Sequence, residues 1–83
     1  MAYFNFKLLG GFVDERSEND IEIPFEATVE QVKEMVRKTF KIAPMLTIEL
    51  MFKGVKLKDK EKWGMLSIRP LKDTLLVIGH RND

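Results

Sequence analysis

Residues 21–40 read IEIPFEATVEQVKEMVRKTF, and this stretch decides the fold because the spacing of its apolar residues changes halfway. Ile21, Ile23 and Phe25 first alternate with polar residues or proline, as in a strand with one buried face. Pro24 has no backbone N–H to donate, so the strand ends there or lies at a sheet edge. We therefore predict a strand over residues 20–25 with these three side chains directed inward.

The second half of the stretch has the spacing of a helix. Thr28 and Gln31 have the separation of a capping box, in which each side chain accepts a hydrogen bond from the other residue's backbone N–H. Apolar residues then follow at helical intervals, at Val29, Val32, Val36 and Phe40, with Met35 alongside. Because the residue before a proline avoids the helical region, Ala43-Pro44 should stop the helix. We predict a helix over residues 28–40.

The flanking sequence supplies further strands. Alternation predicts strands over residues 3–9, 47–53, 55–57 and 73–78, a turn over residues 10–20 and a short helical turn over residues 63–66. The order ββαβ(β)β predicts an α+β fold in one domain, residues 1–83, with a mixed sheet of four to five strands packed on one helix. Trp63 is expected to fill the core rather than to form a binding hot spot.

Composition excludes several kinds of function. The 83 residues include no cysteine and one histidine, so thiolate catalysis and disulfides are excluded and a metal site is not expected. No apolar run approaches the roughly 18 residues of a membrane span. The lysines at 53, 56, 58, 60 and 62 alternate with acids and lack interleaved aromatics, so we do not expect nucleic-acid binding. We expect no enzyme activity, no cofactor and no membrane association.

Charge is unevenly spread along the chain. Residues 1–34 hold eight acids and three bases, whereas residues 35–83 hold eleven bases and five acids. The division is consistent with a dipolar soluble surface, or with a basic face that steers an acidic partner towards it. Both interpretations remain open, because strands from the two halves interleave in the predicted sheet.

Several segments resemble the ubiquitin family. Residues 21–33 resemble the second strand and helix start of ubiquitin, and Leu50-Met51-Phe52-Lys53-Gly54 and Leu57-Lys58-Asp59 resemble the segments that follow. The spacing holds over residues 3–79. The resemblance implies the ubiquitin-like β-grasp fold, in which one helix lies across a curved mixed sheet.

A narrower resemblance lies in the second half of the chain. Trp63-Gly64 and Thr74-Leu75-Leu76-Val77-Ile78-Gly79 resemble the N-terminal ubiquitin-like domains of proteasome-associated deubiquitinases and BAG co-chaperones. Val55 and His80 depart from the deubiquitinase pattern, which has a second glycine and a serine or threonine at these places. The resemblance implies a monomeric module that binds a ubiquitin receptor or a proteasome subunit, in the cytoplasm or nucleus. It leaves open whether a catalytic domain follows.

The sheet face away from the helix carries the candidate binding site. Met51, Leu76 and Ile78 are expected to point outward from neighbouring strands, and the resemblance implies that Met51 and Ile78 occupy recognition positions of ubiquitin. Three cations, Lys53, Lys56 and Arg69, are expected to frame them and to guide an encounter. Leu9 or Phe12 is a further candidate from the preceding loop.

The alternative is a ubiquitin-like modifier precursor. Modifiers end in a flexible diglycine, whereas this chain ends Ile78-Gly79-His80-Arg81-Asn82-Asp83, so cleavage would have to expose Gly79. Gly79 as the end of a strand or the start of a linker is the other interpretation. A structural subunit whose partner covers the apolar face is a third possibility.

Overall fold

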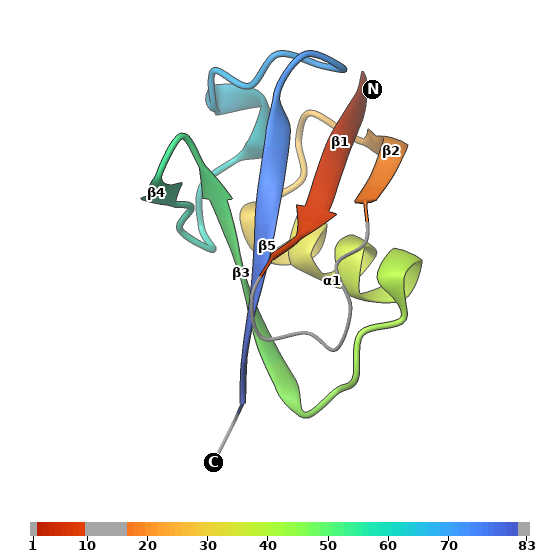
Figure 1. Ribbon diagram of the computed structural model, residues 1–83. Coiled ribbons are helices and arrows are strands. Elements are labelled where there is room, and N and C mark those ends of the chain that lie inside the picture. The colour runs from red at the N-terminus through yellow and green to blue at the C-terminus, as the bar shows by residue number, and fades with distance from the viewer. Residues whose placement is uncertain (1, 10–16, 82–83) are drawn as a thin grey trace.

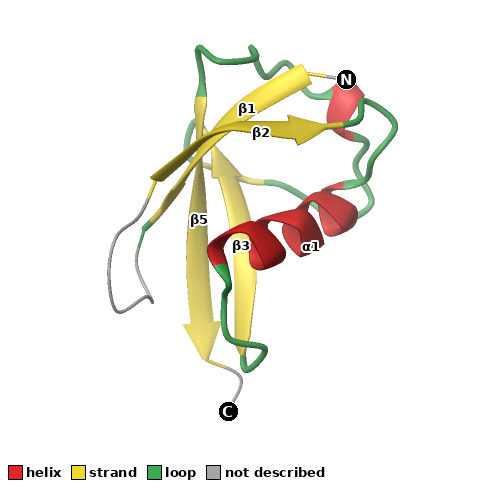
Figure 2. Ribbon diagram, turned by 90° about the vertical axis from the view of Figure 1, so that its right-hand side faces the viewer, coloured by secondary structure: helices red, strands yellow, loops and turns green. Residues whose placement is uncertain are grey.

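The computed structural model describes residues 2–9 and 17–81 and contains one helix laid across a twisted sheet (Figures 1 and 2). The elements are β1 (Ala2–Leu8), β2 (Ser17–Ile23), α1 (Val29–Phe40), β3 (Leu46–Phe52), β4 (Val55–Lys56), a single 3₁₀ turn η1 (Trp63–Met65) and β5 (Thr74–Arg81). The strand order is β2-β1-β5-β3-β4, with β1 parallel to β5 and the other pairs antiparallel. The predicted α+β β-grasp architecture, with its single helix and mixed sheet, is confirmed.

Helix α1 begins at the predicted capping box. The Thr28 N–H donates to Gln31 Oε1 over 2.9 Å, and the Gln31 N–H donates to Thr28 Oγ1 over 3.3 Å. The helix ends at Phe40, because Lys41 adopts a left-handed conformation with φ of 55°. The stop therefore precedes Ala43-Pro44, which we had expected to end the helix.

The core lies between α1 and the facing side of the sheet. Its large members are Phe4, Phe6, Leu8, Ile23, Val29, Val32, Val36, Phe40, Ile48, Leu50, Trp63, Leu75 and Val77. Trp63 is 1% exposed, with the ring of Phe4 at 5.4 Å edge-on and that of Phe6 stacked at 6.0 Å between centroids. The expectation that Trp63 belongs to the core is confirmed.

The prediction that Phe25 points inward is wrong. Its side chain is 51% exposed, because the chain leaves the sheet after Ile23 and turns, with the Ala27 N–H donating to the Pro24 carbonyl over 3.2 Å. Alternation continued in the sequence for two residues after the sheet pairing had ended.

Two boundaries also differ from the prediction by three residues. Strand β2 begins at Ser17, paired with Lys7, so the expected turn over residues 10–20 is too long; residues 10–16, and with them Phe12, lie outside the described residues. Strand β5 runs to Arg81 instead of ending at Ile78, since Gly79 pairs with Ile48 and His80 with Thr47.

Neither a membrane-spanning helix nor a metal-binding cluster occurs in the part of the chain that the structure describes. Over residues 2–9 and 17–81 no helix is long and apolar enough to cross a membrane. Within the same ranges, no three histidine, aspartate or glutamate side chains gather closely enough to hold a metal ion.

Candidate docking face on the sheet

Figure 2 shows that α1 covers one side of the sheet. The other side presents three apolar side chains on the neighbouring strands β3 and β5. Met51 of β3 pairs directly with Leu76 of β5, and Ile78 lies one outward position farther along β5, opposite Glu49. Side chains that are paired or diagonal across antiparallel strands contact one another. We call Met51, Leu76 and Ile78 the outer apolar cluster.

The outward direction of the cluster follows from strand alternation. Leu50, Leu75 and Val77, which precede or follow cluster residues, are fully buried against the helix side. Successive side chains of a strand point to opposite faces, so the cluster residues stand on the other side. Each of the three is half-buried, because its neighbours on the outer face cover part of it. The structure thus brings together the three apolar residues that the sequence singled out.

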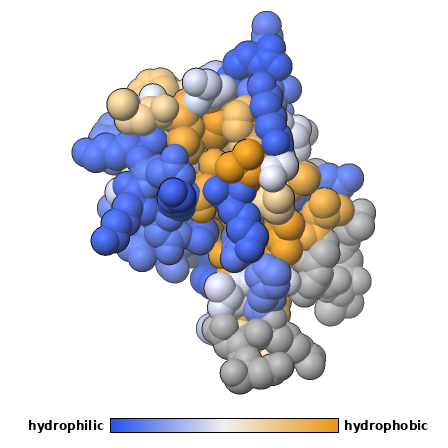
Figure 3. All heavy atoms as spheres, turned by 90° about the vertical axis from the view of Figure 1, so that its left-hand side faces the viewer, coloured by the Kyte–Doolittle hydropathy of each residue, from blue (hydrophilic) through white to orange (hydrophobic). Residues whose placement is uncertain are grey.

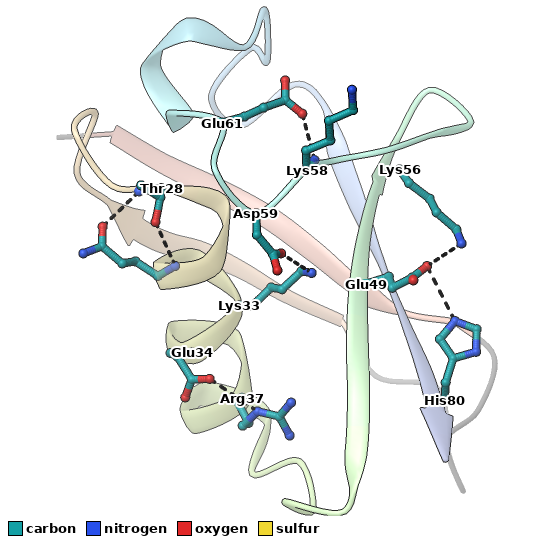
Figure 4. Close-up of polar contacts among 11 residues, drawn as sticks. Thr28, Lys33, Glu34, Arg37, Glu49, Lys56, Lys58, Asp59, Glu61 and His80 are labelled. Carbon is teal, nitrogen blue, oxygen red and sulfur yellow. Dashed lines mark hydrogen bonds and ion pairs between the residues drawn. The ribbon is translucent and has the colours of Figure 1, made fainter. Parts of the chain in front are cut away.

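Three ionisable side chains adjoin the cluster (Figure 4). Glu49 Oε2 lies 3.0 Å from Lys56 Nζ on β4 and 3.6 Å from His80 Nε2 on β5. The bond from Lys56, together with the charges of Lys56 and His80, outweighs partial burial and lowers the pKa of Glu49. Since Lys56 pairs with Met51 and Glu49 with Ile78, these charges border the cluster directly.

The other two predicted cations contact residues outside the cluster. Arg69 holds Asp73, with 2.9 Å between Arg69 Nη2 and Asp73 Oδ1 and 2.9 Å between the Arg69 N–H and Asp73 Oδ2. Lys53 Nζ lies 5.2 Å from the centre of the Phe52 ring, and its charge contributes to the lowered pKa of Asp73. Of the three cations, Lys56 alone is paired with a cluster residue in the sheet ladder.

Sequence reasoning missed several residues of this face. Lys7 pairs with Leu76, a contact between parallel strands that no local pattern reveals. Glu49 and His80 come together through the antiparallel pairing of β3 with β5, which no local pattern reveals either. Tyr3 and Leu71 are 47% and 53% exposed, although both are large and apolar, and Leu71 follows a proline in a loop that has no periodicity. Figure 3 shows that apolar and hydrophilic residues alternate over the edge of the molecule formed by β3 and β4.

Comparison with known proteins gives one family match and several structural ones. The model of the ubiquitin family matches residues 6–82. A search of curated protein sequences finds no significant match.

Among solved structures, ubiquitin of Caldiarchaeum subterraneum is 25% identical, with a TM-score of 0.71 and 96% of each chain covered. The UBL domain of Plasmodium falciparum Dsk2 is 20% identical, with a TM-score of 0.65, over 94% of this chain and 99% of that domain. ATBAG1, solved in complex with HSP70, is 17% identical, with a TM-score of 0.63, over 90% of this chain and 39% of that one. The last two similarities concern the fold alone.

Proposed function

Because the chain belongs to the ubiquitin family, we propose that it is a non-catalytic docking module whose outer apolar cluster binds a ubiquitin receptor, such as one on the proteasome. The observation that carries the proposal is the direct pairing of Met51 with Leu76, next to Ile78, on the sheet face that the helix leaves uncovered. Adjacent apolar side chains on a solvated face typically mark an interaction site.

The composition of the cluster suits a surface that adapts to its partner. Methionine has three rotatable bonds and a polarizable sulfur, so Met51 can adjust to different apolar side chains. Leu76 and Ile78 offer more rigid contacts from a regular strand, which keeps the cost of ordering them on binding low. Burial of the cluster would supply the affinity, and the cations Lys56, Lys53 and Arg69 would speed the encounter.

The test is a charge placed in the centre of the cluster. Ile78→Asp would put a carboxylate beside Glu49 and bury it on binding, so affinity for the isolated ubiquitin-binding domain of a proteasomal receptor should fall at least about tenfold. Ile78→Thr, which keeps a β-branched side chain in the strand, should weaken binding less and leave the fold intact.

The matched control is Met45→Asp, since Met45 is 65% exposed in the connection between α1 and β3, outside the sheet. The variants are compared by calorimetric titration after circular dichroism and urea unfolding have established that they fold. Wild-type affinity of a folded Ile78→Asp protein would refute the proposal.

The modifier alternative finds no support in the position of Gly79. That residue pairs with Ile48 inside the β3–β5 ladder and is buried, so a cut after it would fall within a paired strand. A modifier requires an unpaired carboxyl end that can enter an activating enzyme. Mass spectrometry of the protein isolated from cells distinguishes the two functions, because only a modifier would lose residues 80–83.

A further inference from the structure

Two exposed apolar residues lie near the end of the sheet where β1 begins. Tyr3 is 47% exposed and stands on the outer side, because its neighbour Phe4 is buried on the inner side. Leu71 is 53% exposed in the loop between η1 and β5. Figures 1 and 2 both show this loop passing beside the start of β1. We call Tyr3 and Leu71 the tip pair.

A hydrogen bond fixes Leu71 to this face. Asn5 Nδ2 donates to the Leu71 carbonyl over 3.3 Å. Asn5 is the next outward residue after Tyr3 on β1, since Phe4 and Phe6 on either side of it are buried. The backbone of Leu71 therefore lies against the side chain of Asn5, on the face that carries Tyr3 and the outer apolar cluster, and the exposed side chain of Leu71 belongs to the loop held there.

The conformation of Leu71 is unfavourable for a leucine. Its φ is 63°, in the left-handed region that glycine and asparagine adopt more readily. The bonds from Arg69 to Asp73 close the loop around it, so the surrounding contacts impose this conformation. Leu71 thus combines a strained backbone with an exposed apolar side chain. This combination is expected at a functional site.

The tip pair is in line with the outer apolar cluster. Along β1, Tyr3, Asn5 and Lys7 succeed one another on the outer face, with Asn5 opposite Thr74 and Lys7 opposite Leu76. Four residues of strand separate Tyr3 from Lys7, a distance of about 13 Å. One segment of a partner protein is long enough to touch both apolar groups.

The charges on this face favour an acidic segment. Of its acids, Glu49 already contacts Lys56, and Asp73 is held by Arg69. Lys7 stands beside Leu76, and Lys72 follows Leu71 in the tip loop. Among the outward side chains that the structure describes, Glu22, opposite Tyr3 at the sheet edge, is a third acid. The positive charges therefore adjoin both apolar groups.

We propose that the docking face is bipartite: an acidic segment of the partner places apolar side chains on the outer apolar cluster and on the tip pair, with a carboxylate near Lys7. This inference rests on the proposed docking function and specifies the partner's chemistry. It predicts that Tyr3 and Leu71 contact the partner directly, in addition to the outer apolar cluster.

Leu71→Gly is the central test, because glycine removes the side chain and adopts the positive φ without strain. If Leu71 served stability, the change would lower the urea midpoint. We expect instead an unchanged or raised midpoint, with affinity for the same receptor domain reduced about fivefold, a loss typical of one partly buried leucine at an interface. Tyr3→Thr should reduce affinity by a similar factor.

Charge is tested by Lys7→Gln and by salt. The variant should bind more weakly at 50 mM salt, and its affinity should depend less on ionic strength than that of the wild type. Met45→Ser, which truncates a more exposed apolar residue outside the sheet, should bind as the wild type does.

The outcomes separate the two proposals. If Ile78→Asp weakens binding while Leu71→Gly and Tyr3→Thr do not, the bipartite face is refuted and the docking function stands. If Ile78→Asp has no effect but the tip variants weaken binding, the cluster is refuted and the tip pair is the anchor. If none of the three changes affinity, both proposals fail.

Discussion

Gly64 lies directly against Phe25. A Cβ added at Gly64 would come within 2.9 Å of the Phe25 carbonyl oxygen and 3.2 Å of Phe25 Cβ, distances that require the backbone to move. The Gly64 N–H donates to that same carbonyl over 2.9 Å, so the contact belongs to a row of backbone bonds between residues 25–30 and 59–64. This row holds the segment that carries Trp63 under the sheet.

The contact predicts that Gly64→Ala destabilises the fold. The methyl group must displace backbone atoms, which costs about 1–3 kcal/mol. Gly54→Asn is the matched control, because Gly54 has φ of 78° and open space around it, and asparagine tolerates that conformation. Urea unfolding measures both variants. Equal midpoints for Gly64→Ala and the wild type would contradict the close approach.

The capping box gives a second prediction. Thr28→Ala removes the hydroxyl that accepts from the Gln31 N–H and should lower the free energy of unfolding by about 1 kcal/mol. Thr39→Ala makes the same substitution at an exposed position inside α1, where alanine is the better helix former, and should be neutral or stabilising. A loss as large for Thr39→Ala as for Thr28→Ala would mean that capping does not account for the effect.

The capping box also shows which parts of the fold a sequence can predict. Thr28 and Gln31 are three residues apart and bond to each other, so both the signal and the structure are local. The inward residues of β3 and β5 were equally predictable, because the alternation of apolar and polar residues indicates which side of a strand is buried. Helix α1 and the outward direction of Met51 were predicted on these grounds.

Long-range pairing determined what the sequence did not reveal. Ser17 belongs to β2 because Lys7 lies opposite it, although the residues around Ser17 are polar and read as a turn. His80 belongs to β5 because it pairs with Thr47 beyond a glycine that interrupts the apolar pattern. Phe25 was misassigned for the converse reason, since its alternation continued after the pairing had ended. The tip pair depends on the bond from Asn5 to Leu71, which joins residues 66 positions apart.

Acid should weaken the fold through Asp73. The bond from the Arg69 guanidinium, supported by the Arg69 N–H, holds the pKa of this carboxyl below its ordinary value. Because the folded pKa is the lower one, the stabilisation is fully present above the unfolded pKa of about 4 and is lost as pH falls through the folded pKa. Glu49, whose pKa is lowered chiefly by the bond from Lys56, should act in the same direction.

Asp73→Asn tests that dependence. The variant should be less stable than the wild type at pH 7, and the difference should shrink as the pH falls below the ordinary aspartate pKa and the wild-type carboxyl takes up a proton. Urea midpoints at pH 7, 4 and 2.5 provide the measurement. A difference that stays constant over this range would assign the effect to the shape of the side chain and not to its charge.

Trp63 carries a buried N–H that costs free energy. Its Nε1 is closed off from solvent and has no hydrogen-bond acceptor among the described residues, while the ring itself packs on Phe4 and Phe6. Trp63→Phe would remove the unsatisfied donor, a gain of about 1–3 kcal/mol that offsets much of the lost packing. Trp63→Ala also removes the donor, but it loses nearly all of the packing of the side chain and should cost about 3–5 kcal/mol. Unfolding in urea, followed by circular dichroism because the variants lack the indole, should therefore show Trp63→Phe much nearer to the wild type than to Trp63→Ala. If the two variants were equally unstable, the indole N–H would have to be satisfied in solution, and the core around Phe4 would differ from the arrangement described.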